Sequence, residues 1–85
     1  MNRIEIYTKS YCPYCQRAKE LLRIKGAEFV EYDVTGDPAR EEEMRTRSGR
    51  STVPEIFIAN NLIGGCSELF DLDESGELDR LLDLK

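Results

Sequence analysis

Two cysteines, Cys12 and Cys15, flank the dipeptide Pro13-Tyr14. Proline suits the first position of a helix, where its missing N–H would have no partner, so we expect a helix to begin at Pro13. The two cysteines then lie on one helix face about one turn apart and can form a small disulfide. Cys12 lies at the positive end of the helix dipole with Lys9 nearby, and both favour thiolate over thiol. The spacing predicts redox chemistry, with Cys12 as nucleophile and Cys15 as resolving thiol.

Two other uses of such a cysteine pair fit the sequence less well. A structural zinc site usually takes four Cys or His ligands, whereas this chain has no His and only one further cysteine, Cys66. We therefore expect no metal site. A pair of inert core cysteines remains the weaker alternative, because Pro13 and the loop-to-helix position indicate an exposed end. Cys66 has no neighbouring cation, so we expect it to pack as a small apolar side chain.

The composition limits the class of protein. The chain has 85 residues, of which 34% are charged, and a net charge of −5. This length predicts one domain, residues 1–85, and the negative charge makes nucleic acid a poor partner. No apolar run approaches the roughly 20 residues that cross a bilayer, and the first residues read as a strand rather than a signal peptide. We expect a soluble, cytoplasmic protein in a reducing compartment, where structural disulfides are rare.

The hydrophobic pattern predicts alternating strands and helices. Apolar residues alternate in 3–8, as in a strand, and recur at helical spacing from Tyr14 to Leu22. Asp37-Pro38 opens a second helix, which is poor in apolar residues and is expected at the periphery. A tight turn at Asn60-Asn61 joins the last two strands. The predicted order is strand, helix, strand, helix, strand, strand, helix, at residues 3–8, 13–25, 28–34, 38–48, 55–59, 62–63 and 66–84, with a break in the last helix near 75–76.

This order predicts an α/β fold with a mixed sheet. The first strand, helix and strand form a unit with parallel strands, and the hairpin adds antiparallel ones. The expected architecture is a four-stranded mixed sheet flanked by helices.

Three segments carry a family resemblance. Thr8-Lys9-Ser10-Tyr11-Cys12-Pro13-Tyr14-Cys15, Thr52-Val53-Pro54 and Gly64-Gly65-Cys66 resemble, in order and spacing, the signature segments of small bacterial dithiol glutaredoxins. The resemblance implies a thioredoxin-like fold and reduction of protein disulfides and protein–glutathione mixed disulfides. It also implies glutathione as co-substrate, with glutathione reductase acting only through glutathione and no permanently bound cofactor. We expect a monomer.

The resemblance also assigns the residues that bind glutathione. It implies that Lys9 contacts the glycyl carboxylate and that the Tyr14 ring flanks the tripeptide. Thr52-Val53-Pro54 is expected to carry a cis proline. A cis bond there turns the N–H and C=O of Val53 outward, where they pair with the cysteinyl backbone of glutathione like one more strand.

The glycine pair and the residues after it are expected to hold the γ-glutamyl end. Glycines let the backbone approach a ligand closely, and the helix that follows points N–H groups at an anion. The resemblance implies contacts from Gly65, from Cys66 through its N–H, and from Ser67. The family usually has two Asp after this cysteine, whereas this chain has Ser67 and Glu68. Because Ser67 offers only a neutral oxygen, we expect weaker recognition of the glutathione ammonium group.

A second departure lies at the start of the second helix. Glu41 stands where the family usually has a Gln or Arg that meets the glycyl carboxylate, so Arg40 is expected to reach that group instead. Further along, Arg45, Arg47 and Arg50 are expected to form a solvated basic surface that steers acidic partners or glutathione.

Two alternative functions remain open. One is a glutaredoxin-like redoxin that a thioredoxin reductase, rather than glutathione, keeps reduced. The other is a carrier of a [2Fe–2S] cluster bridged between two subunits, against which Pro13 and Cys15 both argue, because a rigid dithiol motif holds such a cluster poorly.

Overall fold

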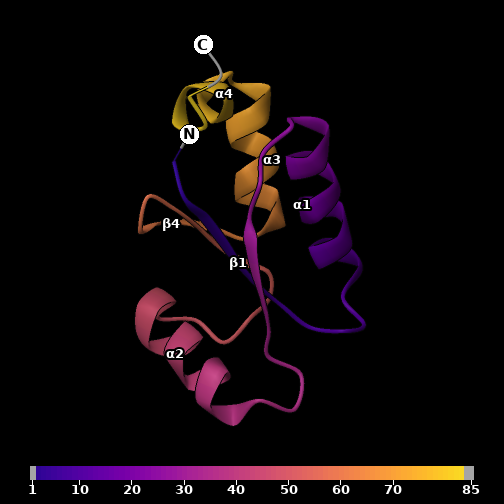
Figure 1. Cartoon of the computed structure of the whole chain (residues 1–85), viewed down its shortest axis with the longest axis vertical. Coiled ribbons are helices and arrows are strands. Elements are labelled where there is room, and N and C mark those ends of the chain that lie inside the picture. Colours follow the sequence, from indigo (N-terminus) through magenta and orange to yellow (C-terminus); the bar gives the residue numbers. More distant parts are fainter. Residues whose placement is uncertain (1, 84–85) are drawn as a thin grey trace.

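The chain alternates strands and helices in the predicted order, and the computed structural model describes residues 2–83. Its first half forms β1 (Ile4–Thr8), α1 (Pro13–Ile24), β2 (Val30–Asp33) and α2 (Pro38–Ser48). Its second half forms β3 (Glu55–Ile58), β4 (Asn61–Gly64), α3 (Cys66–Glu74) and α4 (Glu77–Leu81) (Figure 1). The predicted break near 75–76 separates α3 from α4, and Leu84, where the predicted helix ended, lies outside the described residues. None of the helices within residues 2–83 is long and apolar enough to cross a membrane.

The four strands form one mixed sheet in the order β2-β1-β3-β4. β1 and β2 are parallel, whereas β3 is antiparallel to both β1 and β4. The parallel pair requires the long crossover that α1 provides, and the antiparallel pair β3 and β4 needs only a tight turn. The predicted α/β class and four-stranded mixed sheet are therefore confirmed.

The turn between β3 and β4 lies one residue earlier than predicted. Ala59 and Asn60 adopt positive φ angles of 52° and 66°, and Asn61 already pairs with Ile58 as the first residue of β4. Two consecutive left-handed residues match the twist of a two-residue hairpin. Alanine has no preference for this conformation, so the pairing of the strands, rather than local propensity, sets the position of the turn.

The sheet separates two clusters of apolar side chains. Ile4 and Ile6 of β1 pack with Leu22 and Leu69 on the face that α1, α3 and α4 cover. Tyr7 belongs to the cluster on the other face, because successive strand residues point to opposite sides. Figure 1 shows α1 beside α3, and α2 apart from them at the other end of the molecule. The larger cluster thus supports the helix that carries the cysteines.

Helix α2 is peripheral, as predicted, and an arginine attaches it to the sheet. Met44 alone among the α2 residues is buried. Arg47 Nη2 lies 3.0 Å from Glu5 Oε1, and its guanidinium carbon lies 4.0 Å from the centre of the Phe57 ring. The Glu5 side chain is only 9% exposed. Arg47 is therefore a packed residue, and not part of a solvated basic surface with Arg45 and Arg50.

Candidate functional site

Cys12 lies at the junction of three segments of the chain. It is the N-cap of α1, and the backbone N–H of Cys15 donates a hydrogen bond to its sulfur at 3.1 Å. The thiol in turn donates to the Val53 carbonyl, with the sulfur 3.8 Å from that oxygen. Cys12 is half-buried, so its sulfur is within reach of a substrate. An N–H donor at a helix start points at the atom that carries the charge of a thiolate.

Cys15 and Cys66 have surroundings of a different kind. Cys15 is completely buried, and burial, followed by its hydrogen bond with Cys12, raises the pKa of the Cys15 thiol to about 12. Burial also raises the pKa of the Cys66 thiol. Cys66 packs into the larger apolar cluster, as the sequence predicted. Among the three cysteines, Cys12 is the most accessible, and Cys15 lies beneath it as a protonated thiol.

This difference in burial among the three cysteines predicts that alkylation is selective for Cys12. At pH 7, iodoacetamide is expected to add one carbamidomethyl group, on Cys12, because alkylation requires an accessible thiolate. Mass spectrometry of the intact protein and of its tryptic peptides measures the number and position of adducts. In denaturant, where burial is lost, three adducts are expected. A native adduct on Cys15 or Cys66, formed as fast as the one on Cys12, would contradict the prediction.

The loop before β3 faces the dithiol. Its Val53-Pro54 peptide bond is cis, as the resemblance implied. The Thr52 hydroxyl donates to Glu55 Oε2 at 2.9 Å, and Glu55 is completely buried. Arg50 Nη2 lies 3.2 Å from the other carboxylate oxygen of Glu55. The loop is thus tied to a buried carboxylate directly behind it.

A cavity of about 320 Å³ extends from this loop to the start of α3. It brings together most of the residues that were predicted to bind glutathione, although they come from three separate parts of the chain. Tyr14 stands at its edge and is 59% exposed. The cavity is lined by Tyr14, Arg50, Thr52, Val53, Pro54, Glu55, Gly65, Cys66, Ser67 and Glu68.

Three charged residues of this cavity were not predicted as site residues: Arg50, Glu55 and Glu68. Glu68 Oε1 accepts the Gly65 N–H at 2.7 Å, and this bond together with the N–H of Glu68 holds the pKa of the Glu68 carboxyl below its ordinary value. The sequence held a signal for two of them. Glu55 directly follows the predicted cis proline, and Glu68 occupies the third helical position after Gly65, where a Glu side chain caps the helix start.

The first glycine of the pair has a steric role. Gly64 has a φ of 117°, and a Cβ at this position would lie 2.9 Å from Arg50 Nη2 and 3.0 Å from Glu68 Oε1. Gly65 lies next to the cis-proline loop: a Cβ at this position would be 3.3 Å from the Pro54 carbonyl oxygen. The glycine pair thus permits the close approach of α3 to the loop.

Lys9 is not among the residues that line the cavity. Its ammonium nitrogen lies 3.7 Å from Glu41 Oε2, and Arg45 Nη1 lies 3.9 Å from the same oxygen. Arg40 was expected to reach the glycyl carboxylate of glutathione, but in the structure it contacts other residues of the protein. Its guanidinium donates to Glu43 at 3.1 Å and stacks 4.3 Å from the centre of the Tyr32 ring. Lys9 and Glu41 therefore form an ion pair on the α2 side of the dithiol.

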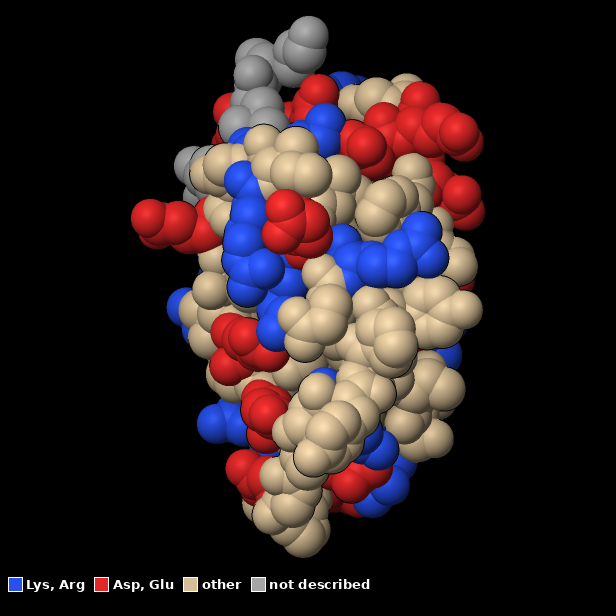
Figure 2. Space-filling model, turned by 90° about the vertical axis from the view of Figure 1, so that its right-hand side faces the viewer, with Lys and Arg blue, Asp and Glu red and all other residues tan. Residues whose placement is uncertain are grey.

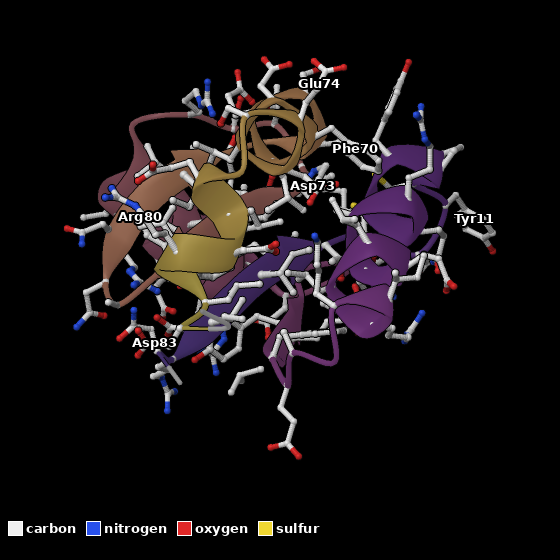
Figure 3. The ribbon with its side chains drawn as sticks, turned by 90° about the horizontal axis from the view of Figure 1, so that it is seen from above. Tyr11, Phe70, Asp73, Glu74, Arg80 and Asp83 are labelled. Atoms are coloured by element: carbon white, nitrogen blue, oxygen red, sulfur yellow. The ribbon has the colours of Figure 1, made fainter. Side chains whose placement is uncertain are left out.

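The surface around the dithiol combines aromatic and charged groups. Tyr11 is 96% exposed. The Arg17 guanidinium lies 6.0 Å from the Tyr14 ring and 5.4 Å from the Phe70 ring. Figure 3 shows Phe70 pointing from α3 towards α1, and Tyr11 on the far side of α1 pointing outward. Figure 2, which faces α1 and the loop before it, shows acidic side chains gathered at the α3–α4 end and basic ones across the upper middle. Uncharged side chains cover the centre and lower part, with charges of both signs along the edges. Local charges, rather than a uniform field, must therefore orient a charged ligand.

The described part of the chain, residues 2–83, contains no group of three or more Cys, His, Asp or Glu side chains placed to hold a metal ion.

Comparisons with known proteins agree with this geometry. The family model for glutaredoxin matches residues 4–63. The chain is 56% identical over 82 residues to Glutaredoxin 3 of Escherichia coli, covering 96% of this chain and 99% of that protein. It superimposes on the solution structure of a glutaredoxin from Brucella melitensis with a TM-score of 0.84 and 51% identity, covering 96% of this chain and 89% of that one. It also superimposes on the crystal structure of a buckwheat glutaredoxin–glutathione complex with a TM-score of 0.88 and 29% identity, covering 96% and 77% of the two chains. The fold is thus the thioredoxin-like fold of these proteins, and the chain belongs to the glutaredoxin family.

Proposed function

We propose that this protein is a glutathione-dependent thiol–disulfide oxidoreductase that reduces protein disulfides and protein–glutathione mixed disulfides. One observation carries the proposal. The half-buried sulfur of Cys12 accepts the Cys15 N–H, while the Cys15 thiol lies buried one helical turn below. An accessible sulfur that accepts an N–H is suited to be the nucleophile, and a buried protonated thiol is suited to act second, as the resolving thiol.

The reaction proceeds by two thiol–disulfide exchanges. The Cys12 thiolate attacks the glutathione sulfur of a mixed disulfide, forms a new S–S bond, and releases the substrate cysteine as a thiolate. A glutathione thiolate then attacks this bond, which yields glutathione disulfide and restores the Cys12 thiolate. On a protein disulfide, Cys15 loses its proton and attacks the bond between Cys12 and the substrate. The resulting Cys12–Cys15 disulfide is reduced by two glutathione molecules.

The site offers a place for each part of glutathione. The cysteinyl residue pairs with the backbone of Val53, which brings its sulfur to Cys12, since the Val53 carbonyl already lies 3.8 Å from that sulfur. The γ-glutamyl end then extends over the cavity towards Gly65, Cys66 and Ser67, at the start of α3. That the similar buckwheat protein was crystallised with glutathione supports this ligand.

Flanking groups complete the proposed binding site. An extended tripeptide that crosses Val53 has its two ends on opposite sides of that residue. With the γ-glutamyl end over the cavity, the glycyl carboxylate points to the opposite side, towards Lys9. Tyr14, at the edge of the cavity, lies beside the tripeptide. No permanently bound cofactor enters this scheme, because glutathione is consumed and replaced in each cycle.

The proposed partners are glutathione and proteins that carry disulfides or glutathionylated cysteines. We place the protein in the cytoplasm as a monomer, in keeping with its similarity to a bacterial glutaredoxin. Glutathione reductase then supports the cycle indirectly, by regenerating glutathione.

The proposal is tested by determining which electron donor supports turnover. The substrate is the mixed disulfide of glutathione with a small thiol, and the reaction is followed by the oxidation of NADPH. With glutathione and glutathione reductase, turnover is expected to rise in proportion to the protein added. With thioredoxin reductase in their place, no turnover above background is expected. The reverse result would keep the redox chemistry but contradict the dependence on glutathione.

A further inference from the structure

The ion pair between Lys9 and Glu41 has a consequence for substrate choice. Lys9 Nζ lies 3.7 Å from Glu41 Oε2, and both side chains are partly open to solvent, with 43% and 29% of their surface exposed. The pair is therefore accessible to a ligand. A carboxylate that approaches Lys9 from solvent also approaches Glu41, because the two charged groups are in contact.

Arg45, the second partner of Glu41, does not remove the repulsion between Glu41 and an approaching carboxylate. Arg45 Nη1 lies 3.9 Å from Glu41 Oε2, but Arg45 Nη2 donates to Glu42 at the shorter distance of 2.9 Å. Arg40, the other cation at this end of α2, is held by Glu43 and by the Tyr32 ring. Of these three cations, Lys9 is thus the one that belongs to the segment leading into Cys12, and Glu41 is the carboxylate paired with it.

The chemistry of the substrate differs at this point between glutathione and a protein. In glutathione, the residue after the cysteine ends in a free carboxylate. In a polypeptide, the same residue continues through a neutral peptide bond. A carboxylate beside Lys9 gains one attraction and meets one repulsion of similar range, whereas a peptide group meets neither.

We propose that Glu41 is a specificity-determining residue that cancels the preference of Lys9 for a free carboxylate, so that this end of the site accepts a continuing peptide bond about as well as the glycyl carboxylate of glutathione. The inference rests on the proposed function and on the placement of the glycyl end beside Lys9. It assigns to this end of the site a relaxed selectivity, while recognition of glutathione depends on the cavity at the start of α3.

The test compares two substrates that differ in one group. One cysteine-containing peptide is joined by a disulfide either to glutathione or to glutathione amide, in which the glycyl carboxylate is a carboxamide. The value of kcat/KM for each disulfide is measured at a fixed concentration of glutathione. For the wild type, the ratio of the acid to the amide substrate is expected to lie close to one.

Removal of the Glu41 charge is expected to change this ratio. In Glu41→Gln, the ratio should rise about three- to ten-fold in favour of the acid, which is the range of a partly exposed ion pair, and the gain should shrink at high salt. Glu20→Gln is the matched control, since it removes the same charge from a surface ion pair with Arg23 that does not involve Lys9 or Glu41, and it should leave the ratio unchanged. In the double variant Lys9→Gln/Glu41→Gln, the gain should disappear, because the effect acts through Lys9.

Two results would overturn the inference. An unchanged ratio in Glu41→Gln, with good turnover of both substrates, would contradict it and leave the proposed function intact. An equal rise in Glu20→Gln would show a general effect of net charge, and would also contradict it. A wild type that turns over neither substrate would contradict the proposed function itself.

Discussion

Replacement of Cys12 by serine is expected to lower the turnover of a glutathione mixed disulfide by more than about a thousand-fold, because it removes the attacking atom. The Cys15 N–H and the Val53 carbonyl that surround this sulfur can contact a serine hydroxyl, but a hydroxyl does not exchange with a disulfide. The measurement is the glutathione reductase-coupled assay, on wild type and variant at equal concentration.

Cys15→Ser is the matched variant, since it also replaces one sulfur by oxygen. It is expected to retain turnover of the glutathione mixed disulfide within about ten-fold, because glutathione itself resolves the intermediate. It should lose the reduction of protein disulfides, for which Cys15 must close the Cys12–Cys15 bond. Full activity of Cys12→Ser, or equal loss in both variants on the mixed disulfide, would contradict the assigned roles.

Arg47→Met is expected to cost about 2 to 4 kcal/mol of unfolding free energy at pH 7, because it leaves the Glu5 carboxylate without its main partner. The Glu5 side chain is 9% exposed and Arg47 24% exposed, so neither is freely solvated. Methionine retains much of the packing against Phe57, so that the loss reports mainly on the charge. Urea unfolding, followed by far-ultraviolet circular dichroism, measures the difference.

Arg45→Met is the control, because Arg45 lies on the same helix and forms ion pairs at the surface with Glu41 and Glu42. Its 47% exposed side chain predicts a change within about 0.5 kcal/mol. Equal losses in the two variants would show that Arg47 has no special role in attaching α2 to the sheet.

The stability that the Glu5–Arg47 pair contributes is expected to fall at acidic pH. The hydrogen bond from Arg47, which is the largest cause, holds the pKa of the Glu5 carboxyl below its ordinary value. The stability that this carboxylate contributes is therefore present above the ordinary pKa of a glutamate, about 4.3, and is lost as the pH falls through the lower folded value. The difference between wild type and Arg47→Met should shrink over that acidic range. A difference that stays constant down to pH 2 would exclude the charge of Glu5 as its source.

The sequence determined the local features of this protein. The predicted order of elements and the start of α1 at Pro13 are found in the structure, because proline geometry and hydrophobic periodicity depend on neighbouring residues alone. Helix α2 likewise begins at Pro38 with Asp37 as its cap. The motif Cys12-Pro13-Tyr14-Cys15 indicated the chemistry for the same reason, since its spacing within one helical turn places both sulfurs together.

Only the tertiary structure decided which distant charges meet. Arg47 and Arg50 were predicted as one solvated surface, yet one packs against Glu5 and the other against Glu55. The pairing of Lys9 with Glu41, and the engagement of Arg40 elsewhere, follow from how α2 lies against the sheet. A charged side chain shows no periodicity that reveals its partner, and its long, flexible stem lets it reach several. Its contacts are therefore set by the packing of segments that lie far apart in the chain.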